Sequence, residues 1–466
     1  MNVSTAIFIG FLAFSLLLSL LSKGRHGHGR QSAKDFFVGS RQFSAALVFF
    51  LSAGEIYSIT TMAGLPGGIY AKGPLYGVWF LGYVLLAYPV GYFMAPRIWE
   101  LGRRYDATTL PDLFLGYYGS PALEKVVAAT AILFLLPWGQ LQFTGLIAAL
   151  KALGWHFDPV LLICFAAVLA FLYVAISGIR GSAYVAVLKD VLMVVAIVAV
   201  GVAVALEAGV QPVFDAAGAK FSTTMGAQDL CFTMSTILLQ SLGFYVLPFN
   251  VQNVFTARSP DTIRRSLIGM PLYMFMFPFL VLASYYAISA NLKLGSPNEA
   301  FFAAATSLLP EWSLGIIAAA ASLSALVVLA GVCLCISTMS TRNLVPNLAE
   351  SRQKGCACTV IVVYLLLSIV LSLTTSNLMV TLLNTAYNGI TQFFPGVIIA
   401  LFGWRIRKHA VLAGILTGQA LALALYFTQP PLFGFSAGLA ALLANVAVVV
   451  ATGWVFQQRL DPVATR

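Results

Sequence analysis

Apolar residues gather along this chain into long runs that short polar segments separate. An α-helix rises about 1.5 Å per residue, so about 20 apolar residues cross a hydrocarbon core of about 30 Å. Runs of roughly this length lie at residues 3–22, 43–70, 74–97, 122–150, 158–178, 185–208, 229–250, 268–290, 314–340, 358–374, 378–404, 409–428 and 432–456. The pattern predicts an all-α integral membrane protein with thirteen transmembrane helices.

The distribution of Lys and Arg predicts the orientation of these helices. With thirteen spans, the loops on one side hold only Lys72, Lys151, Lys220 and Lys293 of the 26 basic residues. Because basic residues favour the cytoplasmic side, the N-terminus is expected outside and the C-terminus inside. No Lys or Arg precedes the first run and a basic cluster follows it, so we expect a retained helix rather than a signal peptide.

Composition narrows the class of protein. The 466 residues are 60% hydrophobic and 9% charged, whereas a soluble domain is about 25% charged. The net charge of +10 is spread over short loops, so we expect no nucleic-acid partner. The sequence has no phosphate-binding loop and no buried triad or metal-ligand pattern, which argues against ATP-driven transport and against an enzyme. A small-molecule solute and membrane lipid are the expected partners, with no obligatory protein partner evident. The expected location is the plasma membrane, as a multi-pass protein of a bacterial inner membrane.

One acidic residue lies where a charge is costly. The stretch 51–68 reads LSAGEIYSITTMAGLPGG, and its Glu55 falls about 18 Å into the second run, near the middle of the bilayer. Gly54 weakens the helix, Ser58 supplies a hydroxyl, and the glycines and proline of 64–68 predict a second break. Interrupted helices persist in membranes where the freed backbone groups line a cavity. The alternative is a protonated Glu55 that hydrogen-bonds a neighbouring helix, with glycine serving close packing.

A second interruption suggests internal symmetry. The seventh run contains Gln240, Gly243, Phe244 and Pro248, a proline and glycine pattern like that of the second run. Helices 2–6 and 7–11 are equal in number and opposite in orientation, so an interrupted first helix in each set predicts a five-plus-five inverted repeat. The single transporter domain, 1–466, then divides into the parts 1–42, 43–208, 229–404 and 405–466.

Polar residues in three further runs complete the candidate site. In the ninth run, the Ser337 and Thr338 hydroxyls could face the carbonyls freed at 54–57 and form an oxygen cage for a hard monovalent cation. The alternative is that these hydroxyls bond back to carbonyls of their own helix. The fourth run carries Trp138 with nearby amides, and the eleventh carries polar residues that are consistent with a water-lined face. Asp190 begins the sixth run and could meet an outgoing cation.

Six segments together resemble the sodium:solute symporter family. They are DFFVGSRQ (35–42), SAGEIYSITTMAGLPGGIYAKG (52–73), TTLPDLFLGYYGS (108–120), SGIRGSAYVAVLKD (177–190), LPFNVQNVFTARSPDTIRRS (247–266) and STMSTRN (337–343). This resemblance implies the leucine-transporter type fold and sodium as the coupling ion. The family includes carriers of proline, pantothenate, sugars, iodide and monocarboxylates.

The resemblance also implies a set of sodium ligands and a set of solute contacts. The sodium set consists of carbonyls near Gly54, Tyr57 and Leu334, the hydroxyls of Ser337 and Thr338, and Asp190 near the cytoplasmic exit. Two of the three positions where proline carriers place substrate-contacting Trp, Tyr and Pro differ here, and the motifs look closer to the monocarboxylate branch. The solute contacts that the resemblance implies are Gln240, Phe244 and Pro248. The polar residues of the runs add the predicted contacts Glu55, Ser58, Trp138, Gln140, Gln142, Tyr387 and Asn388.

The sequence thus predicts a sodium-coupled symporter that takes up a small organic solute by alternating access. Two alternatives stay open. One is proton coupling through Glu55, whose pKa burial would raise. The other is a membrane sensor that only binds its ligand, although no output domain accompanies the membrane part.

Overall fold

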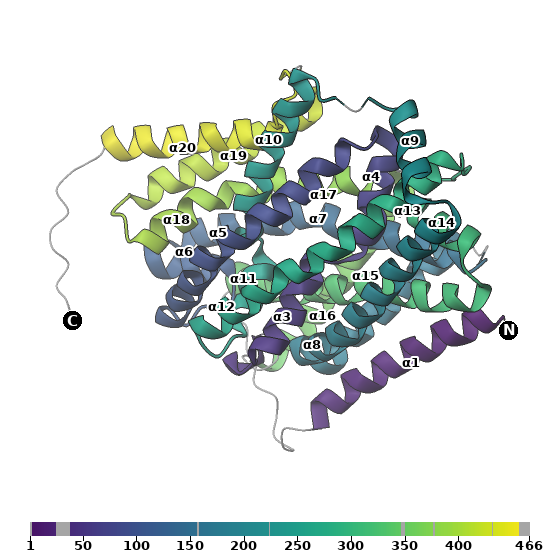
Figure 1. The fold of residues 1–466 in the computed structure, drawn as a ribbon. Coiled ribbons are helices and arrows are strands. Elements are labelled where there is room, and N and C mark those ends of the chain that lie inside the picture. The colour runs from purple at the N-terminus through teal and green to yellow at the C-terminus, as the bar shows by residue number, and fades with distance from the viewer. Residues whose placement is uncertain are drawn as a thin grey trace.

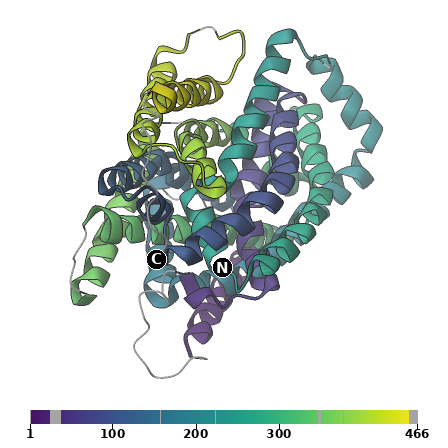
Figure 2. The same ribbon diagram turned by 90° about the vertical axis from the view of Figure 1, so that its left-hand side faces the viewer.

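The computed structural model describes residues 2–24, 38–155, 158–222, 224–345, 350–375, 378–430 and 432–455. These residues form a helical bundle (Figures 1 and 2). Within them, nine helices are long and apolar enough to cross a membrane, and the one β-type contact is an isolated bridge between Phe43 and Ala257. The all-α membrane architecture is therefore confirmed, whereas thirteen spans and the orientation of the termini stay predictions.

Every predicted run falls on helix. The helices that carry the runs are α1 (Val3–Gly24), α3 (Ala45–Ile56), α4 (Leu65–Lys72), α5 (Tyr76–Arg104), α7 (Pro121–Ala152), α8 (Pro159–Glu207), α10 (Ala227–Gly243), α11 (Pro248–Phe255), α13 (Phe277–Ser289), α15 (Glu311–Met339), α16 (Glu350–Thr374), α17 (Met379–Ile390), α18 (Phe394–Phe402), α19 (Lys408–Thr428) and α20 (Ala437–Val455). Several of them are joined by single turns of other helix types. These are η2 (Thr60–Gly64), η3 (Phe244–Val246), η4 (Met270–Met276), η6 (Ser340–Leu344) and η7 (Thr391–Phe393).

Both predicted interruptions are present. The second run is broken at Tyr57 and Ser58 between α3 and η2, and the seventh is broken by η3 between α10 and α11. The further break predicted at 64–68 is wrong, because α4 is helical through these residues. Gly64 ends the π-type turn η2, which runs directly into α4, so Pro66 lies inside a helical stretch that begins at Ile59. Single π-type turns are a common irregularity within α-helices and accompany bends such as those that proline causes.

Helix α8 differs from the prediction. Its helical backbone is continuous over 49 residues and joins the predicted spans 158–178 and 185–208. A straight helix of this length would extend about 74 Å, more than twice a hydrocarbon core. The loop expected between the two spans is therefore helical.

Segments predicted as loops contain short helices. These are α6 (Leu110–Tyr118), α9 (Val210–Lys220), α12 (Pro260–Gly269) and α14 (Ala300–Leu308). Helix α6 shows why they form: the Thr109 side chain accepts from the Asp112 amide, and the Asp112 side chain accepts from the Thr109 amide. This capping box stabilises a short helix that hydrophobicity alone does not reveal.

Helix α15 lies at the centre of the bundle. Within its most apolar window 89% of the residues are buried, against 33% for α1 and 28% for α16. Helix α15 packs against α7, α8 and α1. The pair α19 and α20, in yellow in Figure 1, lies on the side of the bundle away from α1. The central helix can therefore position a site, while the outer helices present apolar side chains outwards.

Candidate functional site

The first break exposes backbone carbonyls in the middle of the molecule. Helix α3 ends at Ile56, and Tyr57 leaves the helical conformation at φ −101° and ψ 72°. The Tyr57 amide still donates to Ala53 at 2.8 Å, and the Thr61 hydroxyl donates to the Ile56 carbonyl at 2.5 Å. Neither of these hydrogen bonds uses the carbonyls of Gly54 and Tyr57. Those two are the carbonyls that the family resemblance implies as sodium ligands.

A lysine from α8 donates hydrogen bonds to both of these carbonyls. The Lys189 ammonium donates to the Tyr57 carbonyl at 2.8 Å and reaches the Gly54 carbonyl at 3.4 Å. It also pairs with the Asp190 carboxylate at 2.6 Å, and both side chains are fully buried. The two carbonyls thus accept two of the three ammonium donors, and the Asp190 carboxylate balances its charge. The structure therefore brings Asp190 to the first break, together with a cation that the sequence analysis did not select.

Sequence reasoning counted Lys189 among the basic residues of a cytoplasmic loop, and that placement is wrong. Lys189 and Asp190 lie inside the predicted apolar run 185–208, where a charged residue marks a functional position. The sequence feature that could have identified this pair is two adjacent residues of opposite charge within one predicted span. In the fold they neutralise each other, which allows both to be buried.

The hydroxyls predicted to coordinate sodium bond within their own helix. Ser337 donates to the Leu334 carbonyl at 2.9 Å and Thr338 donates to the same carbonyl at 2.7 Å. Thr341 in turn donates to the Ser337 carbonyl at 2.8 Å. This is the back-bonded alternative that the sequence left open.

The Lys189 ammonium limits what else can bind at the Gly54 and Tyr57 carbonyls. Two like charges about 4 Å apart repel each other by about 4 kcal/mol at an effective dielectric constant of about 20. A second cation on the same carbonyls would meet this repulsion, with Asp190 already paired. The carbonyl set fits one cation, and the ammonium supplies it.

Aromatic rings connect the first break to the predicted solute residues. The Tyr57 and Tyr273 rings stack with their centroids 4.6 Å apart, and Tyr273 lies beside the Asp190 carboxylate. The centroid of the Trp138 ring lies 5.8 Å from that of Tyr387 and 5.2 Å from that of Phe249. Between these two groups the ring contacts run through Phe277, Phe80 and Tyr83. The predicted contacts Trp138 and Tyr387 are thus brought together, within a buried aromatic layer that reaches the break.

One face of α7 carries polar atoms without a partner. Trp138 and Gln142 are one helical turn apart, and both are buried. The Trp138 indole nitrogen and both polar atoms of the Gln142 amide have no hydrogen-bond partner among the described residues. Gly145 continues this face, and a Cβ there would lie 2.3 Å from Ile59 at the first break. Buried polar atoms are normally satisfied, so this face is the best candidate for solute contact.

Gln140 points away from that face. Its amide nitrogen donates to Thr375 Oγ1 at 2.7 Å and to the carbonyls of Thr375 and Leu371, on and just beyond the end of α16. This amide therefore serves the contact between α7 and α16. Ser58 accepts from the Thr60 amide at the break, and Asn388 lies against Gly438 of α20. The side chain of Glu55 lies outside the described residues.

The second break is held by neutral groups. Asn250 donates to the Phe244 carbonyl at 2.8 Å, and Pro248 begins α11 with its missing amide hydrogen in the first turn. Gln240 donates to Asn384 of α17, while its side-chain oxygen Oε1 is buried and has no hydrogen-bond partner among the described residues. The predicted residues of the seventh run therefore shape a helix junction and contact α17.

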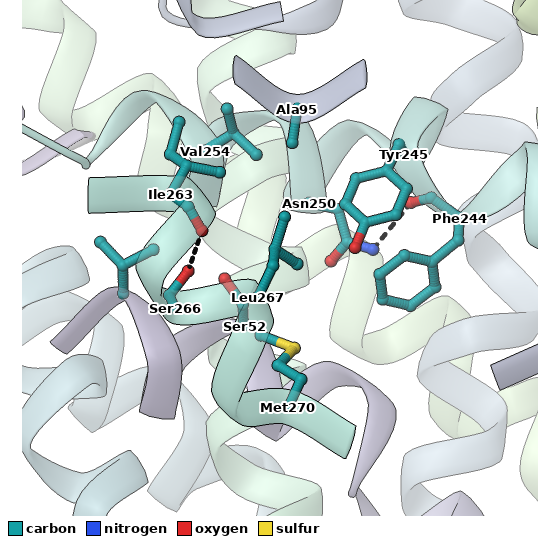
Figure 3. A pocket seen from close by; sticks show the side chains of 11 residues that line it. Ser52, Ala95, Phe244, Tyr245, Asn250, Val254, Ile263, Ser266, Leu267 and Met270 are labelled. Atoms are coloured by element: carbon teal, nitrogen blue, oxygen red, sulfur yellow. Dashed lines mark hydrogen bonds between the residues drawn. The ribbon is translucent and has the colours of Figure 1, made fainter. Parts of the chain in front are cut away.

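A small pocket lies against the second break, among α3, α5, α11 and α12 (Figure 3). Phe244 and Asn250 line it from the second break, and Ser52 lines it from α3. Of the ten predicted solute contacts, Phe244 lines this pocket.

Comparisons with known proteins agree with this architecture. A model described as the sodium:solute symporter family matches residues 36–418. An uncharacterized symporter of Bacillus subtilis is 30% identical over 97% of this chain and 96% of its own. A monocarboxylate transport permease protein of Rhizobium johnstonii is 29% identical over 96% of each chain. A solved Na⁺-coupled sialic acid symporter, substrate-bound and outward-open, is similar in fold, with a TM-score of 0.79 at 18% identity over 99% of each chain.

Proposed function

Because the chain belongs to the sodium:solute symporter family, we propose that it carries a small organic solute into the cell by alternating access, together with a cation. Its relatives are symporters and permeases, and the chain is a multi-pass membrane transporter rather than an enzyme. The family resemblance inferred from the sequence motifs is confirmed. The solute, the ion and the mechanism are the proposal.

We take the solute to be a monocarboxylate or a small amino acid. The observation that carries this choice is the buried face of α7, where the Trp138 indole nitrogen and the Gln142 amide nitrogen are donors without partners. Two donors beside aromatic rings suit a carboxylate with a small apolar part. The similarity to a monocarboxylate permease supports the same class.

Sodium is the first candidate for the coupling ion, on the basis of the family and of the Na⁺-coupled structural neighbour. In this case Ser337→Ala and Thr338→Ala should raise the sodium concentration needed for half-maximal uptake, because each removes an oxygen ligand. A proton gradient is the second candidate. One observation favours it: the carbonyls implied for sodium already bind the Lys189 ammonium.

Uptake into proteoliposomes tests the proposal. Radiolabelled lactate, pyruvate, alanine and proline are supplied under a sodium gradient, a pH gradient, both or neither. We expect accumulation of at least one of them against its gradient when one driving ion is present. Absence of accumulation under every gradient contradicts symport of this class.

Gln142→Leu tests the solute site. Removing the amide should weaken uptake of the preferred carboxylate by about tenfold, since a lost hydrogen bond to a charged group is worth about 1.5–3 kcal/mol. Gln140→Leu is the matched control, because it removes a buried amide of the same helix that bonds α16 instead. The control should lower protein stability and leave the order of competing solutes unchanged. Equal effects of both changes on that order would exclude Gln142 as a solute contact.

A further inference from the structure

Lys189 is unusual among the buried side chains of this protein. It is fully buried, in a group of the largest buried side chains that otherwise consists of Trp, Tyr and Phe. A buried ammonium is tolerated only where it is paired and hydrogen-bonded. Asp190, Tyr57 and Gly54 supply one oxygen each. The residues around Lys189 thus form a buried site that holds one positive charge.

The geometry points to a tethered cation: we propose that the Lys189 ammonium permanently replaces sodium at the first break, so that this site takes no sodium. The proposal rests on the proposed symport and specifies its ion site. Sodium, in the role implied for it, would hold the interrupted helix to the rest of the bundle through the Gly54 and Tyr57 carbonyls. Lys189 makes that connection from α8 with a charge that cannot leave the protein.

Two further features fit this assignment. A Cβ at Gly54 would lie 3.1 Å from both Cε and Nζ of Lys189, so the glycine leaves just enough room for the lysine chain. On the opposite helix, Ser337 and Thr338 both donate to the Leu334 carbonyl. The groups implied for sodium on α15 are therefore engaged within α15, while those on α3 bind the ammonium.

Removing the ammonium should open the site to sodium. In Lys189→Gln the Asp190 carboxylate and the Gly54 and Tyr57 carbonyls keep their places but lose their cation. Hard monovalent cations prefer such oxygen ligands. Lys189→Arg retains the charge and is the matched control.

The experiment measures binding of radioactive sodium to the purified full-length protein in detergent, with choline as the inert cation. We expect Lys189→Gln to bind about tenfold more sodium than the wild type at a fixed low sodium concentration. Lys189→Arg should show no gain, and Lys189→Gln combined with Asp190→Asn should lose the gain, because the anionic ligand is gone. Equal sodium binding by the wild type and Lys189→Gln overturns the proposal.

A melting-temperature measurement covers the case in which the Lys189 variants do not fold. If sodium bound at the first break of the wild-type protein, it would raise the melting temperature more than choline does, and Ser337→Ala and Thr338→Ala would reduce that rise. A saturable, sodium-specific rise that both changes reduce overturns the proposal, whereas no rise, or a rise that neither change affects, supports it. Neither measurement needs a solute, so a failure to transport any organic acid would reject the proposed symport and leave this result standing.

Discussion

The two interrupted helices each free backbone carbonyls inside the protein, and the hydrogen-bond donors that these carbonyls find are chemically different. At the first break the carbonyls of Gly54 and Tyr57 accept from the Lys189 ammonium, which Asp190 neutralises. At the second break the Phe244 carbonyl accepts from the neutral amide of Asn250. Backbone groups freed inside a membrane need internal partners, and each break has one. One partner is charged and comes from another helix, whereas the other is neutral and lies six residues along the same run.

This difference assigns different tasks to the two breaks. A group that replaces the ammonium at the first break must also carry a positive charge, because Asp190 would otherwise be buried without a counterion. The first break therefore holds one positive charge, which the Lys189 ammonium supplies. The second break carries no such requirement.

The largest expected effect comes from removing the counterion at the first break. Asp190→Asn preserves the shape of the side chain but leaves the Lys189 ammonium unpaired, which should lower the free energy of unfolding by about 3–5 kcal/mol. The measurement is thermal unfolding of the purified protein.

Glu299→Gln is the control for Asp190→Asn. It breaks the ion pair between Glu299 Oε1 and Lys151 Nζ, which lie 2.8 Å apart. The lysine side chain of this pair is 47% exposed. Exposed pairs contribute about 0–1 kcal/mol, so this change should be nearly neutral. If both changes cost the same, the Lys189–Asp190 pair does not hold the first break.

The membrane architecture was readable from the sequence because it follows from local features. Hydrophobic length fixes where spans lie, and glycine with proline marks where they break, as at Gly243 and Pro248. The false break at 64–68 shows the limit of composition alone. The helix continues past Pro66 with the π-type turn η2 directly before it, and a pattern of glycine and proline does not show where such a turn forms.

The site was predicted in part, and the missing part is a matter of tertiary contact. The sequence selected Gly54, Tyr57 and Asp190, and the structure brings them together. Lys189 was placed in a loop, because a charge count cannot show that α8 is helical there and carries the lysine to the break from 132 residues away in sequence. Gln140 and Gln142 are two residues apart and chemically identical, yet they point in different directions. Only the packing of α7 against α16 separates them.

A smaller effect is expected at the second break. Asn250→Leu removes the donor to the Phe244 carbonyl and leaves that oxygen buried, at a cost of about 1–3 kcal/mol. Because Asn250 is neutral, sodium should not change this loss of stability. Thermal unfolding in sodium and in choline measures it. A loss that sodium relieves would mean that the second break also takes a cation, and the contrast between the breaks would fail.

The smallest effect, and the sharpest test of the lysine contact, is expected from Gly54→Ala. The added methyl group would lie 3.1 Å from Cε and Nζ of Lys189, closer than an ordinary contact, and overpacking costs about 1–3 kcal/mol. Alanine is also the better helix former by about 1 kcal/mol, so the net loss should be about 1 kcal/mol.

The cause can be isolated by a double-mutant cycle with Lys189→Ala, which removes the atoms that the methyl group meets. In that background Gly54→Ala should become neutral or stabilising, so the two changes should be coupled by about 1–2 kcal/mol. Because both residues belong to the same small site, strict additivity would show that Gly54 does not contact the lysine chain. It would also remove the shape argument for a tethered cation, leaving the hydrogen bonds to the two carbonyls as its support.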